Sequence, residues 1–368
     1  MSKVLYVGKY NESENLTGPE KVAKRIFEQS SKKSETFFLE YFFDGKQYGL
    51  GKKLFGSEVV EKINGSKVLR LGIFKIPFFL IKHRPEIIHI ITFERFAVLC
   101  YLYKLISRVR IVFNVHGVVV YENQKHREVS PAQKRKDLFS EKIFMKFSDK
   151  LLFLSEATVK IAKNIYHINE RKIEYINNGV DEQFHLALKD SKDLNNTLSL
   201  IFIGDSDRYD KDFNFLYNSL GKVTVTCSLF VIGEFNEKKF SQCVNLVSIK
   251  SIPRMSSEEL AKFISDKTIY ISSSSYDTFS IAAAECMSTG LAPIVTDTTG
   301  ISKLVINCKN GFIVKHGDTT VLADKINLLL SDIPLRDKIS ENASRIYNTL
   351  NWPAIFKHYE IIYRSLQA

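Results

Sequence analysis

Two carboxylates on either side of a serine-rich turn are the residues whose types and spacing best suit chemistry. Asp277 precedes a run of small residues, and Glu285 follows it by eight positions. The apolar residues 268–272 predict a strand, and residues 279–288 predict an alanine-rich helix that Gly290 ends. The first N–H groups of a helix have no partner within it and lie at the positive end of its dipole. The turn therefore predicts a site for an anionic group.

The spacing of the two acids limits what they can share. If the intervening backbone is mostly helical, Asp277 and Glu285 lie about 12 Å apart, so one compact ligand group could not easily touch both. A sugar nucleotide could, with its diphosphate at the helix mouth, its ribose near Glu285 and its hexose near Asp277. The same separation argues against a glycosidase, because the carboxyl groups of inverting pairs lie roughly 6.5–9.5 Å apart.

The stretch 270–300 resembles the signature of the retaining glycosyltransferases of family 4, which have the GT-B fold. The family pattern is a pair of glutamates separated by seven residues, then a helix of small residues, a glycine and an apolar strand. The resemblance implies that Glu285 holds the nucleotide ribose. It also implies that Asp277 contacts the transferred sugar, although an aspartate shortens the reach of the usual glutamate by one bond, roughly 1.5 Å.

The resemblance extends to the turn between the two acids. Thr278 and Ser280 replace the glycines that flank Phe279 in the family. Backbone N–H donors do not depend on side chains, so those of Phe279, Ser280 and Ile281 are expected to bind the leaving phosphates. Thr278 is assigned to the same donor-binding turn.

A second loop, residues 204–212, follows the predicted strand 198–203. Family members usually carry Gly-Arg and then Lys-Gly here, and the two cations clamp the diphosphate. Lys211 matches the lysine, Arg208 lies nearby, and Asp205 stands at the arginine position. Asp205-Ser206-Asp207 also imitates the metal-binding Asp-x-Asp of GT-A transferases, but the tripeptide is short and common. The resemblance to GT-B enzymes, which need no such metal, implies that the protein uses none, and we expect no other cofactor.

Two positions in the first half of the chain have both a structural and a functional interpretation. His116 follows the predicted strand 110–115, where open α/β sheets bind ligands, and the resemblance implies a position near the donor sugar. Gly18 precedes Pro19 at the start of the helix 20–31. The resemblance implies an approach to the donor or acceptor, while an ordinary helix start is the commoner meaning.

Length and pattern predict the architecture. A chain of 368 residues exceeds one ordinary core, and strands alternate with helices. Asn178-Gly179-Val180-Asp181 resembles the family motif that closes the first domain. We expect two Rossmann-like domains facing across a cleft, at residues 1–187 and 188–351, with the last helix, 352–368, crossing back to the first.

Charge is uneven along the chain. The net charge is +11, yet residues 1–180 hold 32 Lys and Arg against 19 Asp and Glu, while the remainder holds 20 against 22. Segments 72–84 and 125–150 mix basic with aromatic and aliphatic residues. Segment 72–84 suits a core helix with a solvated basic edge equally well, but two such segments in one domain favour a face toward an anionic membrane surface. Five cysteines lack a Cys-x-x-Cys pair, no secretory signal is visible, and no apolar run reaches roughly 20 residues. These features favour a cytoplasmic protein bound peripherally to the inner face of the plasma membrane.

The predicted reaction is retaining transfer of a sugar from a UDP- or GDP-type donor to a hydroxyl of a glycan or lipid-linked acceptor. Bacterial surface polysaccharide assembly, of lipopolysaccharide or capsule, is the expected setting. One alternative is a GT-B sugar-nucleotide epimerase. Another, of a different class, is a basic nucleic-acid-binding protein, which the lack of a recognisable binding module disfavours. The sequence leaves the donor base, the sugar, the acceptor and the oligomeric state open.

Overall fold

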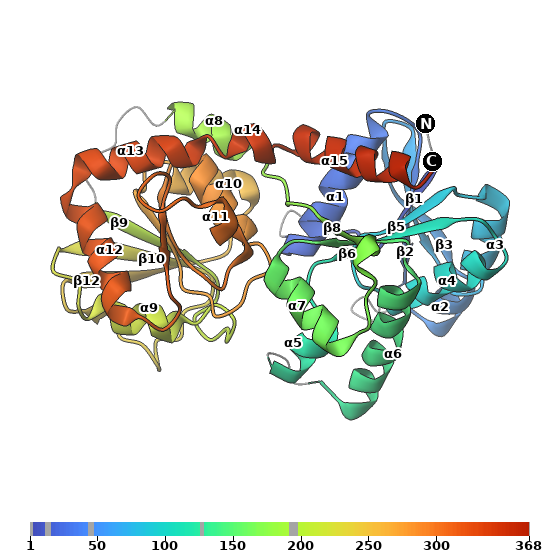
Figure 1. Cartoon of the computed structure of the whole chain (residues 1–368), viewed down its shortest axis with the longest axis horizontal. Coiled ribbons are helices and arrows are strands. Elements are labelled where there is room, and N and C mark those ends of the chain that lie inside the picture. Colours follow the sequence, from blue (N-terminus) through green and yellow to red (C-terminus); the bar gives the residue numbers. More distant parts are fainter. Residues whose placement is uncertain (1–2, 12–15, 43–47, 126–128, 191–197, 368) are drawn as a thin grey trace. The chain divides into compact units, whose positions relative to one another are not determined.

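The chain divides into two compact units, residues 1–177 with 352–368 and residues 178–351. The computed structural model (Figure 1) describes all residues except 1–2, 12–15, 43–47, 126–128, 191–197 and 368. The chain changes unit at Asn177–Asn178, whereas the sequence placed the change at 187–188. The reason is helix α8 (Glu182–Asp190), which packs against α10 (Ser257–Ile264) and α11 (Ile281–Ser288) of the second unit.

The first unit is built on a sheet of strand order β3-β4-β2-β1-β5-β6-β7-β8, parallel except where β3 runs antiparallel to β4. The apolar strands are buried, because helices cover both faces of a parallel sheet. Its strands are β1 (Val4–Val7), β2 (Phe37–Tyr41), β3 (Ser57–Ile63), β4 (Ser66–Leu71), β5 (Ile87–Ile90), β6 (Arg110–Val115), β7 (Lys150–Phe153) and β8 (Ile173–Tyr175). Its helices are α1 (Gly18–Ser31), α2 (Leu50–Phe55), α3 (Lys75–His83), α4 (Val98–Leu105), α5 (Val119–Lys125), α6 (Pro131–Phe147), α7 (Glu156–Ile165) and α15 (Trp352–Ser365).

The terminal helix α15 packs against α1 and is part of the first unit, as the sequence predicted (Figure 1). Tyr363 Oη lies 2.7 Å from Nδ1 of the buried His89, and Asn114 Nδ2 donates to Tyr359 Oη at 3.0 Å. These hydrogen bonds satisfy polar groups in the core of the sheet, so the helix is fixed in register as well as by apolar packing.

The second unit has the strand order β11-β12-β10-β9-β13-β14-β15, with β11 antiparallel to β12 and the others parallel. Its strands are β9 (Ser199–Ile203), β10 (Cys227–Ile232), β11 (Cys243–Val244), β12 (Val247–Ile252), β13 (Ile269–Ser272), β14 (Ala292–Thr296) and β15 (Phe312–Val314). Besides α8, α10 and α11, its helices are α9 (Phe213–Leu220), α12 (Thr319–Ser331), α13 (Ile333–Ser344) and α14 (Tyr347–Leu350).

The order of strands reverses between β9 and β13, because the chain runs outward from β9 to β10 and β12 and then returns to the other side of β9. In open parallel sheets, ligands bind outside the carboxyl ends of the strands at such a switch point. The loops after β9 and β13 are the two that carry the predicted donor-binding residues. The two-unit α/β architecture confirms the predicted fold class.

Candidate active site

The two loops at the switch point are joined by hydrogen bonds through the serine-rich turn. The N–H of Ser275 donates to the carbonyl oxygen of Asp210 at 2.9 Å. Ser273 Oγ donates to the carbonyl oxygen of Lys211 at 2.9 Å. The serines after β13 therefore hold the loop after β9, which is a structural role that the sequence did not reveal.

Lys211 and Asp277 form an ion pair between these loops. Lys211 Nζ lies 2.7 Å from Asp277 Oδ2, and the two side chains are 16% and 17% exposed. Burial by itself raises the pKa of the Asp277 carboxyl. The Lys211 ammonium and two backbone N–H groups outweigh that effect and hold the pKa below its ordinary value. The site thus contains an ionised carboxylate beside an ammonium.

The other oxygen of Asp277 shapes the turn that precedes α11. Oδ1 accepts hydrogen bonds from the N–H groups of Ser280 at 2.8 Å and Phe279 at 3.2 Å. Ser280 has φ +73°, so α11 begins at Ile281 and not at Phe279 as predicted. A phosphate would have to displace Asp277 to reach the N–H groups of Phe279 and Ser280. The first-turn N–H groups of the shortened helix begin with that of Ile281.

Thr278 lies at the close contact between this turn and the turn after β14. The N–H of Gly300 donates to the carbonyl oxygen of Asp277 at 2.9 Å. A Cβ on residue 300 would lie 2.0 Å from the carbonyl oxygen of Thr278, so only glycine permits the contact. The backbone around the two acids is therefore fixed from both sides.

Arg208 binds within its own loop. Its Nε donates to Asp210 Oδ1 at 2.9 Å, and its Nη2 contacts the other oxygen of the same carboxylate. Its side chain remains 52% exposed. The guanidinium is thus held at the loop surface by a bidentate pair, and Lys211 is the cation that lies against Asp277.

Asp205, at the family's arginine position, is paired with Arg254, which follows β12. Asp205 Oδ1 also accepts from the N–H of Glu234 at 2.9 Å. The pairing brings a guanidinium to the loop from 49 positions away, and no local pattern in the sequence predicts it. Asp207 accepts from Asn236 Nδ2 at 2.7 Å. Among the described residues, no three His, Cys, Asp or Glu side chains are grouped so that they could hold a metal ion.

Glu285 lies in the second turn of α11 and is 5% exposed. The helix packs against β13, β14, α8 and α13, so its small side chains permit close contact with the sheet. Glu285 therefore lies on α11, and the turn that holds Asp277 comes directly before the same helix. Its predicted contact with a ribose stays a prediction.

His116, in the first unit, follows β6 at the carboxyl edge of its sheet. Its Nε2 is buried and has no hydrogen-bond partner among the residues described. Burial lowers the pKa of the imidazole to about 4, against the effect of a hydrogen bond to the Ile91 backbone, so the ring is neutral at pH 7. An unsatisfied buried nitrogen calls for an explanation, and a ligand hydroxyl is one.

Gly18 is the first residue of α1 and is exposed. The N–H of Thr17 donates to Glu20 Oε2 at 3.0 Å, and Pro19 is in the first turn. This geometry is that of an ordinary helix start.

In the described part of the chain, no helix combines the length and the apolar character that a bilayer span requires.

Two family models match the chain and together cover parts of both units. One, described as "Glycosyltransferase Family 4", matches residues 55–184, and the other, "Glycosyl transferases group 1", matches residues 189–346. The capsular polysaccharide biosynthesis glycosyltransferase CapM of Staphylococcus aureus is 26% identical over 212 residues, which are 54% of this chain and 52% of CapM. The chain therefore spans about half the length of that relative.

Solved structures share the whole fold. Sucrose-phosphate synthase from Thermosynechococcus elongatus superposes with a TM-score of 0.76 at 15% identity and covers 99% of each chain. HepE from Anabaena, in a complex with UDP-glucose, has a TM-score of 0.72 at 16% identity and covers 99% of this chain and 100% of HepE. These structures show the GT-B fold, and the two family models, which match residues in both units, show that the chain belongs to the family 4 type of glycosyltransferases.

Proposed function

We propose that the protein is a retaining glycosyltransferase that moves a sugar from a nucleotide-diphosphate donor to a hydroxyl of a glycan or lipid-linked acceptor. The observation that carries this proposal is the Lys211–Asp277 pair at the switch point, beside the start of α11. The bond to be broken joins a phosphate to a sugar. An ammonium can bind the phosphate, and a neighbouring carboxylate can bind the sugar hydroxyls.

The barrier of this reaction lies in separating an oxocarbenium-like sugar from a diphosphate. Fixed positive potential on the leaving phosphate lowers that barrier most. We assign this role to Lys211 and to the first N–H groups of α11. The anomeric carbon–oxygen bond to phosphate breaks, the bond to the acceptor oxygen forms on the same face, and the acceptor proton passes to the leaving phosphate.

In the structure, Asp277 pairs with Lys211 and accepts hydrogen bonds from the N–H groups of Phe279 and Ser280. A bound diphosphate would pair with Lys211 in place of Asp277. The Asp277 carboxylate could then accept hydrogen bonds from the sugar hydroxyls. Arg254, held by Asp205, is a further cation at this edge of the sheet and would add to the potential that attracts the donor.

A UDP-type donor is proposed because the structurally similar HepE is described in complex with UDP-glucose. Surface polysaccharide assembly is proposed because CapM, a partial relative, is described as a capsular polysaccharide enzyme. The excess of basic residues in the first half of the chain supports a peripheral position on an anionic membrane.

The test is a thermal-shift screen of the whole protein against UDP, GDP and ADP sugars, followed by product analysis by NMR. We expect one nucleotide class to raise the melting temperature and the product to keep the anomeric configuration of the donor. Lys211→Met should abolish the shift, and Lys222→Met, at the surface after α9, should retain it. A donor that is converted to another nucleotide sugar without acceptor would instead identify an epimerase.

A further inference from the structure

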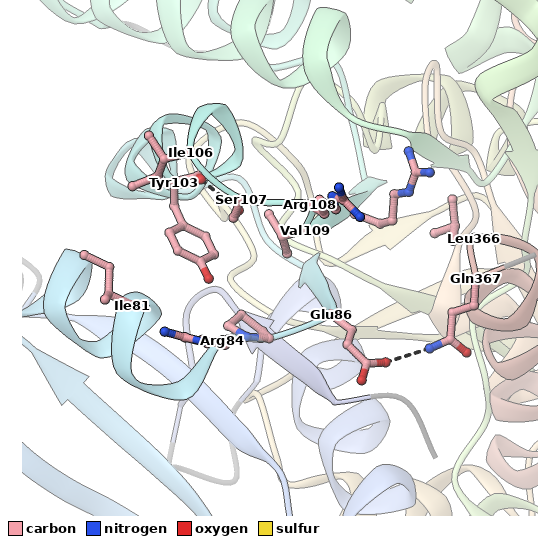
Figure 2. Close-up of a pocket in the computed structure, with 12 residues that line it drawn as sticks. Ile81, Arg84, Glu86, Tyr103, Ile106, Ser107, Arg108, Val109, Leu366 and Gln367 are labelled. Carbon is pink, nitrogen blue, oxygen red and sulfur yellow. Dashed lines mark hydrogen bonds between the residues drawn. The ribbon is translucent and has the colours of Figure 1, made fainter.

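A pocket of about 710 Å³ lies at the amino edge of the first sheet (Figure 2). It is formed where β5 and β6 begin and where α3, α4 and α15 end, and all of these elements belong to the first unit. Val109, Tyr103 and Ile106 are among the residues that line it. No residue that the transfer reaction uses lines it.

Three arginines give the pocket its charge. Arg84, Arg108 and Arg110 line it and are exposed at the surface, and in Figure 2 Arg84 and Arg108 lie on opposite sides. Arg110 Nη1 lies 3.4 Å from Asp149, a carboxylate that Lys104 also binds. The lining carboxylate is Glu86, which accepts a hydrogen bond from Gln367 Nε2 at 2.7 Å. Residues 72–110 contain seven Lys and Arg and two Asp and Glu, so the surrounding field is positive.

Large apolar side chains project from the helices beside the pocket. Phe78 on α3 is 73% exposed, and Leu105 and Ile106 at the end of α4 are 78% and 76% exposed. Helices α3 and α4 pack against each other, so these exposed side chains lie on adjacent helices. Ile76 and Leu80 on the other side of α3 are buried in the core. The segment 72–84 is therefore both a core helix and an amphipathic surface.

Exposed apolar side chains also lie on neighbouring helices of the first unit. Phe55 at the end of α2 stacks on Phe74 with ring centroids 5.2 Å apart, and the two side chains are 59% and 52% exposed. Helix α6, which packs against α4, adds Phe139 at 64% exposed. Aromatic and aliphatic side chains mixed with cations on one face are the composition of surfaces that enter the headgroup region of a bilayer. Residues 126–128 of the predicted basic segment lie outside the described residues.

We propose that this face docks on an anionic phospholipid bilayer and that the arginine pocket takes a lipid phosphate headgroup. Positive charge around the pocket and exposed apolar side chains beside it complement an anionic bilayer in both its charge and its apolar layer. The inference refines the membrane position given in the proposed function and does not depend on the donor site.

The pocket is an anchor and not the acceptor site. It lies where β6 begins at Arg110, whereas His116 follows the other end of that strand. Five steps of about 3.3 Å separate the ends of such a strand, roughly 17 Å. A headgroup in the pocket is thus held at the opposite edge of the sheet from the edge where ligands of parallel sheets react.

The experiment is flotation of the whole protein with phosphatidylcholine vesicles that contain or lack phosphatidylglycerol. We expect binding to the anionic vesicles only. Arg84→Gln/Arg108→Gln/Arg110→Gln should lower the partition coefficient on the order of 100-fold, because each cation near an anionic surface contributes a factor of about five. Phe78→Ser/Ile106→Ser should also lower it without removing the positive charge.

The matched control removes three exposed cations from the second unit: Lys238→Gln/Lys262→Gln/Arg345→Gln. It should leave the partition within about twofold of the unmodified protein, because the proposed docking surface belongs to the first unit and includes none of these three cations. Equal losses in both triple variants would overturn the proposal, since net charge alone would then explain binding. Equal binding to neutral vesicles, or none to anionic ones, would overturn it as well. The nucleotide thermal shift, measured on the same variants, reports the donor site separately.

Discussion

Replacing Asp277 by asparagine tests the central ion pair, because it removes one charge and little volume. Asparagine retains a carbonyl oxygen that can accept from the N–H groups of Ser280 and Phe279, which the Oδ1 atom of Asp277 accepts from now. Lys211 keeps its position but loses its partner at 2.7 Å. The variant therefore isolates the electrostatic part of the interaction.

Both side chains are mostly buried, which sets the magnitude. Breaking a fully buried pair costs about 3–5 kcal/mol of unfolding free energy, whereas a fully exposed pair contributes about 0–1. With 16% and 17% of the side chains exposed, we expect a loss of about 2 kcal/mol for Asp277→Asn. For units of this size that corresponds to a fall of roughly 4–8 °C in the melting temperature.

The stabilisation by the Asp277 carboxylate should depend on pH in a defined direction. The pKa of Asp277 is lowered from 3.8 in the folded protein, so its ionisation stabilises the fold above that pH. This stability is lost as the pH falls through the folded pKa. Thermal melting should therefore separate the two proteins at neutral pH and bring them together well below pH 3.8.

A double-mutant cycle with Lys211→Met completes the test, with a coupling expected at about 1–2 kcal/mol. The exposed pair Lys262–Glu258 is the matched control, and the losses of its two single variants should be nearly additive, because solvent screens an exposed pair. An unchanged gap between wild type and Asp277→Asn at acid pH, or additive losses in the cycle, would refute the assignment of a stabilising ion pair.

Three other predictions follow from single residues. Glu285→Ala should lower donor turnover at least tenfold, about 1.4 kcal/mol of transition-state stabilisation, while Glu258→Ala on the exposed side of α10 should not; an unchanged rate with every donor would contradict the ribose assignment. Ser280→Gly should raise the unfolding free energy by about 0.5–1 kcal/mol in urea titrations, because φ +73° costs a residue that carries a Cβ; a loss of stability would show that its hydroxyl matters more. Stability should fall as the pH drops from 6.5 to about 4, because His89 and His116 have lowered pKa values of about 4 and take up protons only on unfolding; His89→Gln and His116→Gln should each flatten that slope in calorimetry.

Features that depend on near neighbours were predictable from the sequence. The periodic run 110–115 is β6, and the Ser256–Glu259 capping box opens α10, with the Glu259 N–H donating to Ser256 Oγ at 3.3 Å. The hairpin of β3 and β4 was missed although its signal was present. Asn64 and Gly65 adopt φ +48° and +82°, the conformation that an Asn-Gly turn favours between antiparallel strands.

The residue types of the candidate donor site and their chain order were determined by the sequence, through the acids around the turn and the lysine after β9. Their partners were decided by the tertiary structure. Lys211 and Asp277 are 66 positions apart, and Asp205 and Arg254 are 49 apart. Helix and strand propensities act over a few residues. Such ion pairs form only where parallel strands bring distant loops to the same edge of a sheet. A distant contact also explains why α11 begins later than predicted. Asp277, paired with the distant Lys211, accepts a hydrogen bond from the N–H of Ser280, which the sequence analysis had assigned to a ligand phosphate.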